Sequence, residues 1–136
     1  MREILFRGKA ECDNKWVVGS YIPSFEHKWH VQDDVVRSKH VIEFVRDDLI
    51  LDFAPVKEST VGQFTCLTDK NGKKIFEGDV VHMRTSGLSG RGEIVFKDGA
   101  FVIDDKKRKR FYYMYHDAVY RVEGNIYDNP ELMEGE

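Results

Sequence analysis

The segment with the clearest potential for binding chemistry is a basic run that leads into aromatic residues, "KKRKRFYYMYHD". Cations neutralise phosphates and aromatic rings stack on bases, and single-stranded nucleic-acid binding requires both. The residues of this hypothesis are Lys106, Lys107, Arg108, Lys109, Arg110, Tyr113 and Tyr115, with Phe111 on the face of Tyr113 and Tyr112 on the opposite face. A structural interpretation stays open, because Asp104 and Asp105 partly neutralise the run and aromatic residues in strands usually pack in a core.

A second candidate is the glycine- and serine-rich stretch "RTSGLSGRG", which begins at Arg84. Its backbone N–H groups could cradle a phosphate, with Arg84 and Arg91 nearby. The stretch leads into an expected strand and matches neither a P-loop nor a dinucleotide-binding fingerprint, and Ser89 lacks the frame of a nucleophile elbow. The pattern therefore favours a mobile hairpin loop.

The other polar groups give weaker signals. His27 and His30 could share a metal on a helix but would point to opposite faces of a strand, and Asp33 and Asp34 follow them. Surface histidines beside a partly buried Trp29 are the simpler interpretation. We expect no metal, no cofactor and no catalytic residues.

One carboxylate pair and the two cysteines complete these candidates. Glu77 and Asp79 lie two positions apart in "FEGDVV", but Gly-Asp before a strand is common turn chemistry. Cys12 and Cys66 have no metal spacing, which predicts two reduced thiols.

The most patterned stretch, "STVGQFTCLTDKNGKKIFEGDVV" from Ser59 to Val81, is explained by turns without a ligand. Asn-Gly can take positive φ at the centre of a hairpin, and glycine relieves the backbone before a strand. The residues assigned to turns are Gly62, Asn71, Gly72, Gly78, Asp79 and Gly99. This interpretation is architectural.

The elements that must position these residues are short strands. Alternating segments such as "REILFRGKA" with "KWVVGSYI", and "EIVFKDGAFVID", predict hairpins. Residues 23–48 could be helix or strand, with a possible helix over 35–45, although the density of Val, Ile and Phe favours strands. One helical turn is expected in "VKESTVGQ", and "NPELM" predicts a closing helix with Asn129 as its cap.

Taken together, these segments predict an all-β chain with at most one or two short helices, as a small barrel-like or two-sheet domain. We expect one domain over residues 1–136, with sub-sheets over 1–54 and 55–136.

Composition sets the remaining limits. The chain has 136 residues with 41% hydrophobic residues, which allows one domain with a real core. Charged residues make up 33% with a net charge of -3, so that only a local patch could attract nucleic acid. No membrane-length apolar run or signal peptide is present, which predicts a cytoplasmic protein.

Four motifs together resemble the YopX family of phage and prophage proteins: "REILFRG", "TVGQFTCLTDKNGKKIFEGDVV", "GEIVFKDGAFVI" and "VEGNIYDNPELM". One departure is Cys66, which stands where the family pattern has a glycine. The resemblance implies a mostly-β domain acting in the bacterial cytoplasm, and it implies no catalytic residues.

We expect a non-enzymatic accessory protein that acts by interaction with a host or phage protein or by self-association. A homo-oligomer is expected from exposed strand edges and many aromatic residues. The first alternative is single-stranded nucleic-acid binding through residues 106–115, and the second is an enzyme of unknown class.

Overall fold

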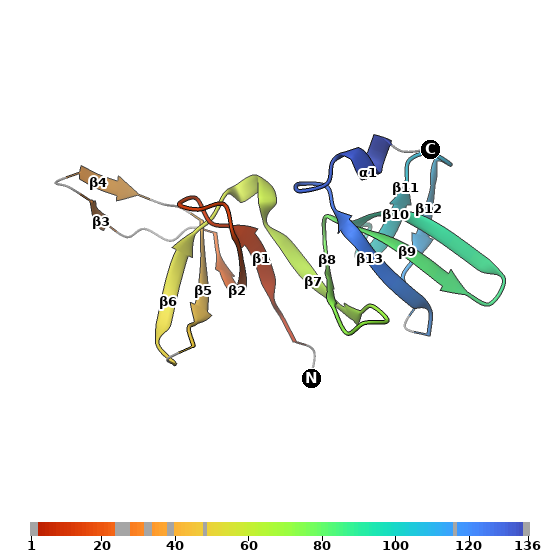
Figure 1. The fold of residues 1–136 in the computed structure, drawn as a ribbon, viewed down its shortest axis with the longest axis horizontal. Coiled ribbons are helices and arrows are strands. Elements are labelled where there is room, and N and C mark those ends of the chain that lie inside the picture. Colours follow the sequence, from red (N-terminus) through yellow and green to blue (C-terminus); the bar gives the residue numbers. More distant parts are fainter. Residues whose placement is uncertain are drawn as a thin grey trace. The chain divides into compact units, whose positions relative to one another are not determined.

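The computed structural model describes residues 3–23, 28–31, 34–37, 40–47, 49–115 and 117–134. Over these residues the regular structure is almost all β-strand, with one 3-10 turn and one short α-helix (Figure 1). All pairs of described strands are antiparallel. The prediction of an all-β fold with at most one or two short helices is therefore confirmed, in its two-sheet form.

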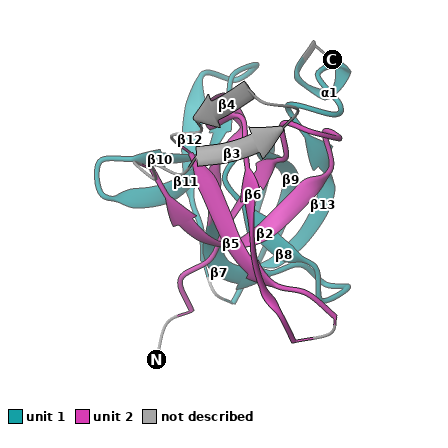
Figure 2. Ribbon diagram, turned by 90° about the vertical axis from the view of Figure 1, so that its left-hand side faces the viewer, with its two compact units in different colours: residues 1–2, 64–136 teal, residues 3–63 magenta. Residues whose placement is uncertain are grey.

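The chain divides into two compact units, Glu3–Gln63 and Phe64–Glu136, which Figure 2 colours separately. The boundary lies within β7 (Gly62–Thr68), later in the chain than the expected division after residue 54. The strand continues through it because Gly62 and Gln63 pair with β1 while Phe64 and Thr68 pair with β8.

The unit Glu3–Gln63 has a sheet with the strand order β6-β5-β2-β1, to which the start of β7 is added. Its strands are β1 (Phe6–Lys9), β2 (Trp16–Ile22), β5 (Val41–Val45) and β6 (Leu51–Pro55). The turn between β1 and β2 has Asn14 at φ 61, a conformation that asparagine tolerates well. Val41, Ile42 and Val56 are fully or almost fully buried in this unit.

A separate strand pair, β3 (Lys28–Val31) with β4 (Asp34–Arg37), answers the question left open over residues 23–48. All regular structure in the described part of that segment is strand, which includes β5, so the strand interpretation is confirmed and the helix over 35–45 is wrong. Val and Ile lose side-chain freedom in a helix and pack well on a pleated surface, which explains the outcome. The 3-10 turn η1 (Glu58–Thr60) follows β6, as expected from "VKESTVGQ".

The unit Phe64–Glu136 has a five-stranded sheet in the order β12-β11-β10-β9-β13. Its strands are β9 (Asp79–Thr85), β10 (Leu88–Lys97), β11 (Ala100–Asp105), β12 (Arg110–Tyr113) and β13 (Val119–Asn125), and β8 (Lys74–Phe76) pairs with β7. The described strands form open sheets, with β12 and β13 at the two ends of this one.

The core of this unit comes from alternate positions of adjacent strands, because side chains along a strand alternate between its two faces. Its buried members are Ile75, Val81, Met83, Ile94, Ile103, Tyr112 and Tyr120. The helix α1 (Glu131–Glu134) closes the unit after Pro130, as "NPELM" predicted. The Asn129 Oδ1 atom accepts the backbone N–H of Asn125 at 3.3 Å, so this side chain fixes the preceding turn.

The hairpin turns of this unit use the glycines that the sequence assigned to turns, with one exception. Gly72, Gly78 and Gly99 have φ of 82, 89 and 85, in the region that favours glycine. Gly62 instead lies inside β7, where Arg7 is its partner. Asn71 also lacks a positive φ, because Asp69 organises this turn with its side chain in place of a two-residue hairpin.

Candidate functional site

A groove of about 490 Å³ on the unit Phe64–Glu136 gathers most of the basic side chains singled out above. It is bounded by β9, β10, the turn between β11 and β12, the start of β12, and α1. Its lining includes five cationic side chains and two carboxylates: Arg91, Lys106, Lys107, Arg108, Arg110, Asp104 and Asp105. We call this surface the basic groove. Its cations come from two separate segments, since Arg91 lies on β10.

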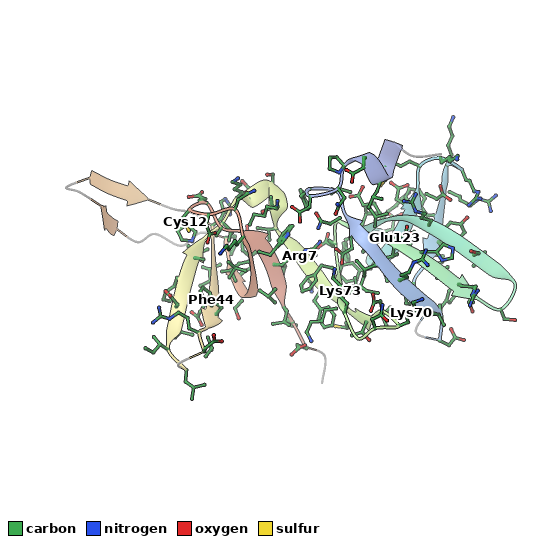
Figure 3. All side chains as sticks on the ribbon, viewed as in Figure 1. Arg7, Cys12, Phe44, Lys70, Lys73 and Glu123 are labelled. Carbon is green, nitrogen blue, oxygen red and sulfur yellow. The ribbon has the colours of Figure 1, made fainter. Side chains whose placement is uncertain are left out.

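Arg91 is anchored by its neighbours. It forms an ion pair with Glu123 of β13, and its Nη1 donates to the carbonyl of Leu132 at 3.4 Å. Arg121 donates to the same carboxylate at 3.1 Å (Figure 3 labels Glu123). Burial raises the pKa of Glu123, but its hydrogen bonds with Arg91 and Arg121 outweigh this effect and lower the pKa. Glu123 therefore stays ionised and holds the Arg91 guanidinium at the groove.

The turn between β11 and β12, residues 106–109, is fixed by Asp105. The backbone N–H of Arg108 donates to Asp105 Oδ1 at 3.1 Å, and Arg108 Nη1 lies 3.4 Å from Oδ2. Asp105 is only 5% exposed, so its carboxylate positions the basic turn and also offsets part of its positive charge. Lys106 Nζ lies 3.4 Å from Glu93.

Lys107 and Arg110 differ from the other groove cations. Among the residues that the structure describes, no carboxylate lies within ion-pair distance of either side chain. Asp105 is the ladder partner of Arg110, but its carboxylate is directed to Arg108. Both cations are exposed on one side of the groove, so they are available to an external anion.

The glycine-rich stretch is part of a hairpin, as expected, but most of it is strand and its turn is short. Only Ser86 and Gly87 form the turn, and Gly90 and Gly92 lie inside β10. A Cβ atom at Gly90 would lie 2.6 Å from the ring of Tyr112, and one at Gly92 would lie 2.2 Å from the carbonyl oxygen of Asp104. These glycines therefore permit close packing of β10 against the β11–β12 hairpin, which shapes the groove floor.

Ser89 and His82 also line the groove, and Ser89 Oγ lies 3.1 Å from His82 Nε2. The two residues come from paired strands, β10 and β9, and the contact is exposed to solvent.

The aromatic residues of the basic-aromatic segment are divided between two faces of β12. Tyr112 is 6% exposed and packs in the core, whereas Phe111 and Tyr113 are 47% and 68% exposed. These two line a separate hollow of about 280 Å³ with Lys97, Asp98 and Val102. We call it the aromatic hollow. The expectation that strand aromatics are core residues therefore applies to Tyr112 and not to its neighbours.

The structure separates the seven predicted binding residues into three groups. Lys106, Lys107, Arg108 and Arg110 line the basic groove, and Tyr113 lines the aromatic hollow. Lys109 lies in the turn at φ 55, and Tyr115 follows β12; neither lines these two surfaces. Lys97 was missed, because nothing in the local pattern of a hairpin lysine indicates an aromatic ring beside it.

Tyr115 has a structural contact of its own. Its carbonyl oxygen accepts the hydroxyl of Tyr120, a core residue that is 2% exposed. Burial raises the pKa of Tyr120 to about 12.

The remaining polar candidates have structural roles or fall outside the described residues. Asp79 is 1% exposed and its Oδ2 accepts the backbone N–H of Phe76 at 2.9 Å, as expected of turn chemistry. His27 and the side chain of His30 lie outside what the structure describes. Cys12 and Cys66 are both exposed and form no disulfide within the described part of the chain.

The described residues contain neither a metal-binding cluster nor a membrane-spanning helix. No group of three or more His, Cys, Asp or Glu side chains within them has an arrangement that could hold a metal ion. None of the helices in the described part of the chain has the length and apolar character needed to span a membrane.

Comparison with known proteins identifies the family. The chain is similar over its whole length to two proteins of known structure. Protein yopX from Bacillus subtilis has 20% identity and a TM-score of 0.49, with 100% of this chain and 99% of that chain covered. Protein EF1440 from Enterococcus faecalis has 18% identity and a TM-score of 0.43, with 98% and 99% covered. No curated protein matches. The model of the YopX protein family matches residues 5–134, and the chain therefore belongs to the YopX family.

Proposed function

We propose that this protein is a non-enzymatic phage or prophage accessory protein that binds the phosphate backbone of nucleic acid in the basic groove. The observation that carries the proposal is the convergence of cations from two segments, Arg91 and residues 106–110, on one concave surface. The phage origin comes from the resemblance of the sequence motifs. Binding in the bacterial cytoplasm is part of the same proposal.

The charge distribution supports a polyanionic partner. The whole chain has a net charge of -3, whereas the groove lining holds five cations and two carboxylates. Glu93 and Glu123 pair with two of these cations, Lys106 and Arg91, so a small positive excess remains, to which Lys107 and Arg110 contribute without an ion pair in the described residues. A concave surface with an excess of positive charge attracts anions. Lys107 and Arg110 can each neutralise a phosphate without first losing an internal ion pair.

Fluorescence anisotropy with labelled oligonucleotides tests this proposal at several salt concentrations. Each phosphate contact contributes about 0.7 to the slope of log K against log salt for a single strand. Replacing both Lys107 and Arg110 with Ala should therefore reduce the slope by about 1.4 and weaken binding at low salt.

The matched control is the double replacement Lys70→Ala and Lys73→Ala, which removes the same charge from the β7–β8 loop (Figure 3). This variant should keep most of the affinity and the wild-type slope. Equal losses of affinity in the two variants would mean that only the net charge of the protein matters, which would contradict a binding site in the groove. Absence of wild-type binding at low salt would reject the proposal.

A second candidate function is self-association through the β5–β6 hairpin of the other unit. Four large apolar side chains at this hairpin are exposed, with fractions of 62%, 86%, 50% and 54% for Val45, Leu49, Ile50 and Leu51. Among the described strands, β6 pairs with β5 alone and forms a sheet edge. An edge strand next to apolar side chains can pair with the same edge of a second copy, which gives a two-fold symmetric dimer.

A further inference from the structure

The aromatic hollow has two exposed aromatic side chains at alternate positions of one strand. Phe111 and Tyr113 are both exposed, and Val102 beneath them is only 4% exposed. Their Cα atoms lie two residues apart on β12, a separation of about 6.6 Å along an extended strand. The two side chains and Val102, the ladder partner of Tyr113, line one hollow, and a flat ring can lie against an exposed aromatic side chain there.

A cation already occupies one ring of this hollow. Lys97 Nζ lies 3.5 Å from the centroid of the Phe111 ring, which is a cation–π contact. At exposed sites this contact is weaker than the stacking of a base on an aromatic ring, so a base can displace the ammonium group. The flexible Lys97 side chain would then remain close enough to pair with a phosphate of the same nucleotide.

The hollow and the basic groove share β12. Along this strand Arg110 and Tyr112 line the groove, whereas Phe111 and Tyr113 line the hollow. Because β12 is the last strand in the order of its sheet, an extended chain can pass around its edge from one surface to the other (Figure 1). A duplex keeps its bases stacked inside and cannot present them to the hollow, whereas a single strand can do so.

We infer that the aromatic hollow is a stacking subsite for the nucleobases of a single-stranded nucleic acid whose phosphates lie in the basic groove. The inference rests on the proposed function, which requires only the phosphates. It adds the class of ligand, single-stranded rather than double-stranded, and it assigns Phe111, Tyr113 and Lys97 to contacts with one nucleotide segment.

The test compares a labelled single strand of about 12 nucleotides with an abasic sugar-phosphate polymer of the same length and with a duplex. We expect the wild-type protein to prefer the base-bearing strand over the abasic polymer by roughly tenfold to 100-fold. The double replacement Phe111→Leu and Tyr113→Leu should lose this preference and retain its affinity for the abasic polymer, because the groove cations are unchanged.

The matched control is Phe96→Leu, because Phe96 is 55% exposed but lines neither surface. This variant should keep the preference. A second readout needs no substitution: 2-aminopurine within the single strand should change fluorescence on binding to the wild-type protein, because its ring environment changes when it stacks on an aromatic side chain.

The outcomes separate the two proposals. Equal affinity for the base-bearing strand and the abasic polymer would overturn the stacking subsite and leave the phosphate-binding groove in place. Duplex binding as tight as single-strand binding would also overturn the stacking subsite. So would a preference for the base-bearing strand that survives in the double Leu variant. Absence of binding to all three probes would reject the proposed function, and the subsite with it.

Discussion

The side chain of Asp69 connects the β7–β8 loop to β13, and its removal should destabilise the unit Phe64–Glu136. Asp69 is 7% exposed, and its Oδ1 accepts the backbone N–H groups of Asn71 and Lys73, each at 2.9 Å. Its Oδ2 accepts the backbone N–H of Val122 at 3.2 Å. Burial raises the pKa of Asp69, but these three hydrogen bonds outweigh it and lower the pKa below the ordinary value of 3.8.

The magnitude follows from the three donors. Each backbone N–H that loses its acceptor costs about 1 kcal/mol when water can partly replace the carboxylate. Asp69→Ala should therefore reduce the free energy of unfolding by about 3 kcal/mol. Asp69→Asn keeps one acceptor oxygen for the loop but presents an NH2 group to Val122, so about half of that loss is expected.

Urea denaturation followed by circular dichroism measures this loss. Tryptophan fluorescence would report on the other unit, because both tryptophans, Trp16 and Trp29, belong to it. The matched control is Asp98→Asn, in an exposed turn at φ 51 that asparagine tolerates, and it should change the stability by less than about 0.5 kcal/mol. If Asp69→Ala matched this control, the hydrogen bonds would not stabilise the fold and the reasoning would be refuted.

The same side chain predicts a pH dependence. The pKa of Asp69 is lower in the folded state than in the unfolded state, where it is near 3.8. The contribution of Asp69 to the free energy of unfolding is therefore fully present above the unfolded-state pKa and is lost as the pH falls through the folded-state pKa. The stability difference between the wild-type protein and Asp69→Asn should therefore stay constant from neutral pH to about pH 5 and shrink below about pH 4. A difference that instead shrinks between pH 7 and pH 5 would contradict the assignment.

Two further predictions concern Cys66 and the β5–β6 hairpin. Cys66 has φ 71, in the region that favours glycine, so Cys66→Gly should relieve backbone strain and stabilise the protein by about 0.5–1 kcal/mol. Thermal unfolding measures this gain, and Cys12→Gly serves as the control. For self-association, we expect light scattering to give the mass of a dimer for the wild-type protein and of a monomer after replacement of Leu49 and Leu51 with Ser. Salt should leave the wild-type mass unchanged. A wild-type protein that stays monomeric at high concentration would reject the second candidate function.

The basic groove shows why a local sequence motif predicted the site only in part. The run at residues 106–110 identified four of the cations that line the groove, because charge density is visible in the sequence. Arg91 joins them through the pairing of β9, β10 and β11, which places the glycine positions of β10 beside the β11–β12 hairpin. Of the aromatic residues that follow the run, strand alternation places Phe111 and Tyr113 in the aromatic hollow and Tyr112 at the groove.

The sequence by itself determined the features that depend on neighbouring residues. Alternating Val, Ile and Phe specified strands, Asp98-Gly99 and Gly72 specified turns, and Pro130 preceded the last helix, because φ preferences and strand alternation act over a few residues. Only the tertiary structure decided which distant groups meet. The contacts of Asp69 with Val122, Arg91 with Glu123, and Lys97 with Phe111 depend on strand order and register, which are fixed by the packing of the whole unit and not by any short segment.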